Sequence, residues 1–184
     1  MPSSPTVIVL AAGQGSRFLA SGGTTHKLDA LLDGLAVLEH VLRAARASGL
    51  PWHLVRPAGG TPGMGDSIAR GVAATASASG WLILPADLPL VRPETLRSVA
   101  QALAGHPVVV PRWRGQAGHP VGFGRQCLAA LAALSGERGA AAVVRAHREA
   151  GTAHDLALSD PGILMDIDTV QDLARAQALL QAQQ

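Results

Sequence analysis

Runs of apolar residues alternate with segments of helical periodicity along most of this chain, and that alternation limits the possible folds. Four such runs predict strands, at residues 7–11, 52–57, 80–91 and 106–112, with shorter ones at 154–160 and 162–168. Helices are expected at residues 38–47, 65–78, 93–105, 124–136, 139–151 and 169–183, with Thr169 as the N-cap of the last. The pattern predicts an α/β fold in which helices cover both faces of a mostly parallel sheet. Neither a repeat nor a break in composition marks a second domain, so we expect a single domain over residues 1–184.

The composition excludes several classes of protein. Aromatic residues make up 3% of the chain and tyrosine is absent, so the stacking platforms of single-strand nucleic-acid binders are missing. The net charge is +2 with no run of like charges, and we therefore expect neither a nucleic-acid nor a membrane partner. The single Cys127 excludes an intramolecular disulfide framework and a cysteine-built metal site. Because no signal peptide or membrane-length apolar run is present, a cytoplasmic enzyme is expected.

In open α/β sheets, ligands bind outside the carboxyl ends of the strands. In this sequence those ends correspond to the segments Ala12–Lys27, Pro57–Ser67, Pro85–Pro89 and Met165–Thr169. They contain most of the unusual chemistry of the chain.

The turn "AAGQGSR" (11–17) follows the first predicted strand. Gly13 and Gly15 would let backbone N–H groups approach phosphate oxygens without obstruction by a Cβ. Arg17 can bind a phosphate in a bidentate fork, and Lys27, the only lysine of the chain, supplies a mobile point charge. The alternative is an ordinary strand–turn–helix connection, because the turn is neither a complete dinucleotide fingerprint nor a Walker A loop.

Carboxylates follow two of the predicted strands. Asp87, held between Pro85 and Pro89, is well placed to bind Mg²⁺, although it could also cap the next helix. Asp166 and Asp168 alternate, so on a strand they would share one face, and either a cation or solvent would relieve their repulsion. Asp168 could alternatively serve only as the entry to the last helix.

Two further stretches carry candidate ligand groups. Gly63 and Gly65 lead into Asp66 and Ser67, which are good N-cap residue types and could lie near a base and ribose. "GDSIA" (65–69) half-matches a hydrolase nucleophile elbow, but the strand that such an elbow needs before it is missing. His119, in a glycine-rich turn that could face the substrate, is equally compatible with a structural and a catalytic role.

Five ordered motifs together resemble the MobA-like nucleotidyltransferases, and most closely their molybdenum cofactor cytidylyltransferase branch. These motifs are "LAAGQGSR…K" (10–27), "PADLPLV" (85–91), "GHPVGF" (118–123), "SGERGA" (135–140) and "DIDTVQDL" (166–173). The resemblance covers roughly residues 6–182. It implies a Rossmann-like three-layer sandwich that uses an NTP and Mg²⁺.

The resemblance also implies an activity, transfer of CMP from CTP to a phosphorylated acceptor such as molybdopterin, with release of pyrophosphate. A guanylyl or other nucleotidyl transfer to a different phosphate acceptor, or a non-catalytic binding module, is the alternative. Contact with a molybdoenzyme or its maturation protein would fit the same role.

Carried over motif by motif, the resemblance assigns roles to residues. Arg17, Lys27 and Asp87 would be catalytic, Asp87 and Asp168 would bind the metal, and Gly118, His119 and Pro120 would contact the acceptor. The nucleotide would be bound by Leu10, Ala11, Ala12, Gly13, Gly15, Ser16, Arg17, Lys27, Gly65, Asp66 and Ser67.

The chain departs from the family pattern at three places. The spacer "FLASGGTTH" (18–26) between the arginine and the lysine is longer than usual. The lead into the acidic turn is "PAD" (85–87), and the loop usually written "GDxGAR" is "GERGAA" (136–141), which lacks the final arginine. The last two departures bear on the identity of the acceptor more than on catalysis.

Overall fold

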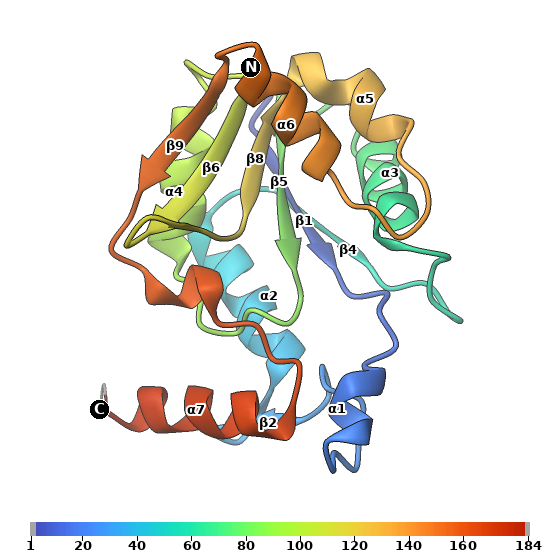
Figure 1. Ribbon diagram of the computed structural model, residues 1–184, viewed down its shortest axis with the longest axis vertical. Coiled ribbons are helices and arrows are strands. Elements are labelled where there is room, and N and C mark those ends of the chain that lie inside the picture. Colours follow the sequence, from blue (N-terminus) through green and yellow to red (C-terminus); the bar gives the residue numbers. More distant parts are fainter. Residues whose placement is uncertain (1–2, 183–184) are drawn as a thin grey trace.

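The computed structural model describes residues 3–182 and contains a seven-stranded sheet with the strand order β4-β1-β5-β8-β6-β7, in which β9 pairs with the other edge of β6 (Figure 1). The strands are β1 (Thr6–Leu10), β4 (Trp52–Val55), β5 (Gly80–Pro85), β6 (Val108–Trp113), β7 (Gln116–Ala117), β8 (Val121–Gly124) and β9 (Ala153–Ala157). A separate two-stranded hairpin is formed by β2 (Leu31–Leu32) and β3 (Leu35–Ala36).

Most strands of the large sheet run in one direction. β1 is parallel to β4 and β5, and β6 is parallel to β9. β8 lies antiparallel between β5 and β6, so β5 and β6 also share one direction. Only β8 and the two-residue β7 run the opposite way. The predicted mostly parallel α/β sheet is therefore confirmed.

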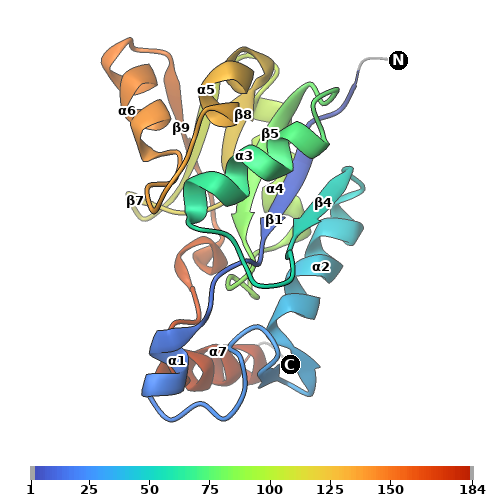
Figure 2. The same ribbon diagram turned by 90° about the vertical axis from the view of Figure 1, so that its right-hand side faces the viewer.

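Helices cover both faces of the sheet (Figures 1 and 2). On one face lie α2 (Val37–Ser48) and α4 (Pro93–Ala102), and on the other lie α3 (Met64–Ala74), α5 (Leu128–Ala132) and α6 (Ala141–Glu149). Beyond the carboxyl ends of β1 and β5, α1 (Ser16–Ala20), the β2–β3 hairpin and α7 (Val170–Gln181) form a lower group. Two 3₁₀-helices complete the chain, η1 (Arg125–Cys127) and η2 (Pro161–Leu164).

The alternation of side chains along the central strands builds two cores. Val9 and Leu84 pack with residues of α2 and α4, whereas Ile8 and Ile83 pack with residues of α3, α5 and α6. All four side chains are buried, so the expectation of strands covered on both faces is confirmed for β1 and β5.

The helices of residues 3–182 are too short to cross a membrane. The longest, α2 and α7, have 12 residues each, whereas a bilayer requires about 20. None of the described helices qualifies as a membrane span.

The prediction of a strand at residues 162–168 is wrong. Asp160 accepts a hydrogen bond from the N–H of Gly162 at 2.9 Å, and with Pro161 at the first helical position this starts η2 in place of a strand. Residues 165–168 then continue without regular structure. Local capping chemistry therefore overrides the apolar character of "GILM" (162–165).

Helix boundaries also differ from expectation. α3 begins at Met64, so Asp66 and Ser67 lie inside its first turn and are not its N-cap, and the helix ends at Ala74. The predicted helix 124–136 is divided into η1 and the short α5. Thr169 is the N-cap of α7 as predicted, in a capping box with Asp172.

The packing of α3 on the sheet leads to a test of the fold. A Cβ at Gly71 would lie 2.5 Å from Cγ2 of Ile8 and 3.1 Å from Cγ2 of Val55. Gly71→Ala is therefore expected to lower the free energy of unfolding by about 1–3 kcal/mol, because overpacking forces helix and sheet apart. Urea denaturation would measure the change. Gly105→Ala, where a Cβ meets open space, is the matched control, and an equal effect of both substitutions would contradict the prediction.

Candidate functional site

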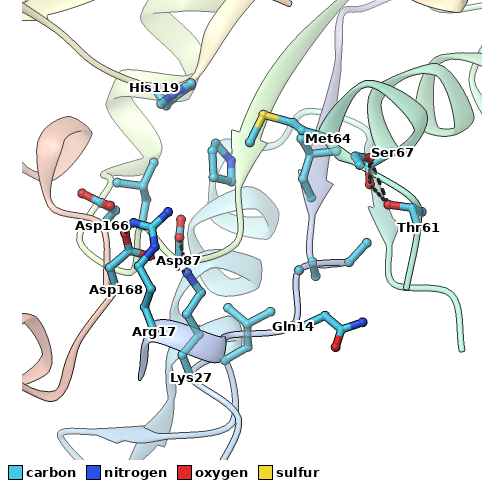
Figure 3. A pocket seen from close by; sticks show the side chains of 18 of the residues that line it. Gln14, Arg17, Lys27, Thr61, Met64, Ser67, Asp87, His119, Asp166 and Asp168 are labelled. Carbon is cyan, nitrogen blue, oxygen red and sulfur yellow. Dashed lines mark hydrogen bonds and ion pairs between the residues drawn. The ribbon is translucent and has the colours of Figure 1, made fainter. Parts of the chain in front are cut away.

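A cavity of about 830 Å³ lies at the carboxyl ends of β1 and β5 (Figure 3). The turn after β1, the loop leading into α3, the turn after β5 and the segment between η2 and α7 contribute to its walls, as the sheet topology predicted. The turn between β7 and β8 adds a further wall. The segments that the sequence analysis singled out therefore surround one space.

Three carboxylates meet at this cavity. Asp87 follows β5, while Asp166 and Asp168 lie in the irregular segment before α7. One carboxylate oxygen from each lies within 4.8 Å of the other two. The N–H of Ile167 donates to the carbonyl of Asp87 at 2.8 Å, which holds the two segments together.

Asp166 is the member of this cluster that the sequence analysis did not assign to the metal. Its two-residue spacing from Asp168 was the available signal, but the strand on which that argument relied does not form. Burial, and then the negative charge of Asp87, raise the pKa of Asp166 above its ordinary value. A cation at this position would relieve both effects.

Lys27 and Arg17, the two basic residues of the first motif, form ion pairs with these carboxylates. Lys27 Nζ lies 2.8 Å from Asp87 Oδ2 and 3.0 Å from Asp168 Oδ1. Arg17 donates to Asp168 Oδ2 at 2.6 Å (Figure 3). Only 14% of the Lys27 side chain is exposed, against 79% for Arg17, so Lys27 is the cation that the fold encloses.

The electrostatics of Lys27 follow from this enclosure. Burial alone would lower its pKa, but the charges and hydrogen bonds of Asp87 and then Asp168 outweigh burial, and the pKa of Lys27 is raised above 10.5. Lys27 is thus held as a cation, and it neutralises part of the acidic cluster.

The acidic cluster has the chemistry of a divalent-cation site. Carboxylate oxygens are the ligands that Mg²⁺ and Mn²⁺ prefer. Asp87 Oδ1 is buried and has no hydrogen-bond partner within residues 3–182, which leaves one strong acceptor free. Asp87, Asp166 and Asp168 therefore fit such an ion.

The glycine turn also lines the cavity. Leu10, Ala11, Ala12, Gly13 and Ser16 all contribute to its wall. Gly15 does not line it and instead serves as the N-cap of α1, with φ +67°. This left-handed conformation favours glycine, so the residue type is set by the turn.

The loop and first turn of α3 contribute Ser67 but neither Gly65 nor Asp66 to the cavity wall. The backbone of residues 135–138 covers these two residues. The N–H of Gly65 donates to the Gly136 carbonyl at 2.9 Å, and Asp66 accepts from the N–H of Gly136 at 2.9 Å. Nothing in the sequence connected these two distant motifs.

Thr61 is a lining residue that the sequence analysis missed. Its hydroxyl lies 2.5 Å from that of Ser67, so the two form a polar pair on the wall near Met64 (Figure 3). Residue type alone does not distinguish Thr61 from the many small polar residues of the chain.

The turn between β7 and β8 places Gly118 and His119 in the cavity wall, whereas Pro120 does not line the cavity. Gly118 donates to the Pro111 carbonyl at 2.9 Å and His119 to the Ile163 carbonyl at 3.1 Å, both through backbone N–H groups. Nδ1 of His119 is buried and has no hydrogen-bond partner in the described part of the chain. An unpartnered ring nitrogen is thus available beside the cavity.

His119 gives the protein a pH-dependent stability. Burial lowers the pKa of His119 below its ordinary 6.5, against the opposing charges of Asp87 and Asp166. The folded protein therefore binds this proton more weakly than the unfolded chain, so the contribution is present above about pH 6.5 and is lost as the pH falls. His119→Gln is expected to reduce the loss of Tm between about pH 7.5 and 5.5. Thermal melts at both pH values would measure the loss of Tm. An identical loss in His119→Gln and in the unsubstituted protein would contradict the prediction.

Comparison with solved structures yields several similar folds. Rv0371c from Mycobacterium tuberculosis H37Rv is 25% identical, with a TM-score of 0.79 and coverage of 97% of this chain and 100% of that one. Its complex with manganese is 24% identical over the same shares, with a TM-score of 0.73. A nucleotidyl transferase from Methanothermobacter, Mth528, is 23% identical, with a TM-score of 0.82 and coverage of 98% and 99%.

A more distant structure has a nucleotide bound. It is CMP:2-keto-3-deoxy-manno-octonic acid synthetase complexed with CTP, at 14% identity, a TM-score of 0.64 and coverage of 99% and 100%. These likenesses agree on a Rossmann-like nucleotidyltransferase fold.

Comparison with curated proteins yields no match. A family model described as the MobA-like NTP transferase domain matches residues 7–151, which include the glycine turn, Lys27, Asp87 and His119. That range is well over half of the chain. The chain therefore belongs to the MobA-like NTP transferase family, a family of nucleotidyltransferases.

Proposed function

We propose that this protein transfers CMP from CTP to the phosphate of a small acceptor of the molybdopterin type and releases pyrophosphate. The observation that carries the proposal is the composition of one cavity. Its walls combine a glycine turn, the enclosed Lys27 with Arg17, and the three carboxylates. Groups suited to phosphate recognition and to divalent-cation binding thus line a single space.

The reaction requires little proton chemistry from the protein. An anionic oxygen of the acceptor phosphate attacks the α-phosphorus of CTP and forms a new P–O bond. The bond from the α-phosphorus to the bridging oxygen of the β-phosphate breaks, and pyrophosphate leaves with those electrons. Because the nucleophile is already charged, positioning and charge neutralisation are what the site must provide.

We assign the two ends of the cavity to the two substrates. The triphosphate would lie along Leu10–Arg17, where Arg17 and Lys27 supply positive charge, and the base would lie toward Ser67. Gly65 and Asp66 would not contact the nucleotide. Their hydrogen bonds with Gly136 would instead hold the segment that carries Ser67 in place. The acceptor would face Gly118 and His119, with Pro120 supporting that turn.

Asp87 and Asp168 would hold Mg²⁺, with Asp166 as a third ligand. When bound at these three carboxylates, the ion would supply positive charge that neutralises the charge developing on the phosphates. Manganese in the complex of Rv0371c supports divalent-ion use by this fold. The CTP complex of the synthetase supports a cytidine nucleotide, and the resemblance of the five ordered motifs to the molybdenum cofactor cytidylyltransferases supports the molybdopterin-type acceptor.

The proposal is tested by measuring pyrophosphate release from CTP or GTP with Mg²⁺, with and without molybdopterin. We expect release only when CTP and molybdopterin are both present. Release with GTP alone among the nucleotides would favour guanylyl transfer. Nucleotide binding without release for any acceptor would favour a binding module. Thermal stabilisation reports binding directly, because ligand at 100 times its Kd adds about 2.7 kcal/mol.

A further inference from the structure

His26 lies next to Lys27 at the end of the long spacer, and its ring is connected to the glycine turn. Its Nδ1 accepts the N–H of Leu28 at 3.2 Å, and its Nε2 lies 2.8 Å from the carbonyl oxygen of Gly13. The backbone N–H of Leu28 can only donate, so Nδ1 of the neutral ring must be the acceptor. The proton of the ring must therefore be on Nε2. The hydrogen-bond network therefore assigns Nε2–H as the donor to Gly13.

This contact fixes the direction of one peptide group. In a trans peptide the C=O and the following N–H point in opposite directions. His26 does not line the cavity, whereas Gly13 and Gln14 do. The carbonyl of Gly13 is thus directed toward His26, and the N–H of Gln14 is directed away from His26.

The N–H groups of the turn are available to a ligand. Within the described residues, the N–H groups of Gly13, Gln14 and Gly15 donate to no protein acceptor. Such groups are strong donors and seek an acceptor. An anionic phosphate oxygen at this end of the cavity would supply one.

The turn needs an external restraint because glycine provides none. A Cβ at Gly13 would meet nothing within 4 Å, so no neighbouring group restrains the residue on that side. Glycine also adopts a wide range of backbone angles. If the Gly13–Gln14 peptide rotated, its carbonyl oxygen would face the phosphate and repel it. The His26 hydrogen bond opposes that rotation.

We infer that His26 is a positioning residue that directs the backbone N–H of Gln14 toward a phosphate of the bound nucleoside triphosphate. This inference rests on the proposed function, since it needs a nucleotide at the glycine turn. It assigns a role to the residue before the lone lysine. It also accounts for the adjacency of His26 and Lys27, since His26 orients the backbone N–H donors and Lys27 supplies positive charge.

The test compares nucleotide affinity in three variants. His26→Ala removes the restraint and is expected to weaken binding of CTP about tenfold, as expected for loss of one backbone hydrogen bond to a charged group. His26→Gln retains an N–H donor that can reach the Gly13 carbonyl, so it should recover most of the affinity. His40→Ala is the matched control, because Nε2 of His40 lies 2.7 Å from the carbonyl oxygen of Leu32, away from the cavity.

Titration calorimetry with CTP and with GTP, each with Mg²⁺, would measure the Kd values. The Kd of His26→Ala is expected to rise by the same factor for both nucleotides, because a backbone donor to the phosphate does not contact the base. At saturating CTP, kcat should change less than about twofold, since the effect is on binding.

Unchanged affinity in His26→Ala would overturn the inference, and so would an equal loss in His40→Ala or no recovery in His26→Gln. If the unsubstituted protein binds neither nucleotide, the proposed function fails, and this inference fails with it. The two failures are therefore distinguishable.

Discussion

Asp87→Asn is expected to lower kcat for pyrophosphate release by about 10³-fold, the scale at which single preorganised charges contribute to catalysis. The substitution keeps the size of the side chain and an oxygen that can accept from Lys27, 2.8 Å away. It removes the negative charge that a divalent cation needs at the centre of the cluster. The fold should survive, because Ile167 contacts the backbone carbonyl of Asp87 and not its side chain.

Steady-state kinetics at saturating CTP and Mg²⁺ would measure this loss, with thermal melts to confirm folding. Asp29→Asn is the matched control. Asp29 is also paired with a basic residue, Arg56, at 3.1 Å, but it is exposed and does not line the cavity. We expect the kcat of Asp29→Asn to remain within about twofold of that of the unsubstituted protein, as is usual for surface substitutions. A kcat for Asp87→Asn within about tenfold of the original would refute the role of Asp87.

The positions of Asp87 and the glycine turn could be predicted because both depend on local patterns. A buried strand followed by a rigid turn places its next polar residue at the carboxyl edge of the sheet. β1 and β5 satisfy that rule, since they are adjacent and parallel. Lys27 and Asp168 were expected at the same edge, but their contact could not be predicted from periodicity. A loop separates Lys27 from the short helix α1, and Asp168 lies in a segment without regular structure.

Other parts of the site depend on contacts between distant segments. The hydrogen bond from Gly136 to Asp66 joins a loop to the first turn of α3, and the one from His26 to Gly13 joins a loop to a turn; loops leave no periodicity in a sequence. The antiparallel strand β8 was not predicted at all, because its short sequence "VGFG" (121–124) was interpreted as part of a glycine-rich turn. For Asp166, the prediction identified the pair of carboxylates but based their proximity on a strand that does not form.

Lys27→Met is expected to lower kcat/KM for CTP by about 10²–10³-fold and, at the same time, to strengthen the binding of Mn²⁺ alone. Lys27 Nζ lies within 3.0 Å of carboxylate oxygens of both Asp87 and Asp168, which are two of the three residues that would hold a divalent cation. The lysine and the metal therefore compete for one cluster. An interaction of about 4 kcal/mol between charges 4 Å apart near a protein surface makes a gain in Mn²⁺ affinity of tenfold or more reasonable.

The same competition predicts an effect on stability that a purely structural role of Lys27 would not produce. Without the lysine, the carboxylates repel one another and the protein should melt at a lower temperature. Mn²⁺ should then raise the Tm of Lys27→Met more than it raises that of the original protein, because only the variant has an uncompensated cluster. Arg97→Met, which breaks the exposed pair with Glu94, is the control and should leave the response to Mn²⁺ unchanged. If Mn²⁺ stabilises Lys27→Met no more than the original protein, the metal does not bind where Lys27 now lies, and the carboxylates are held together by the lysine alone.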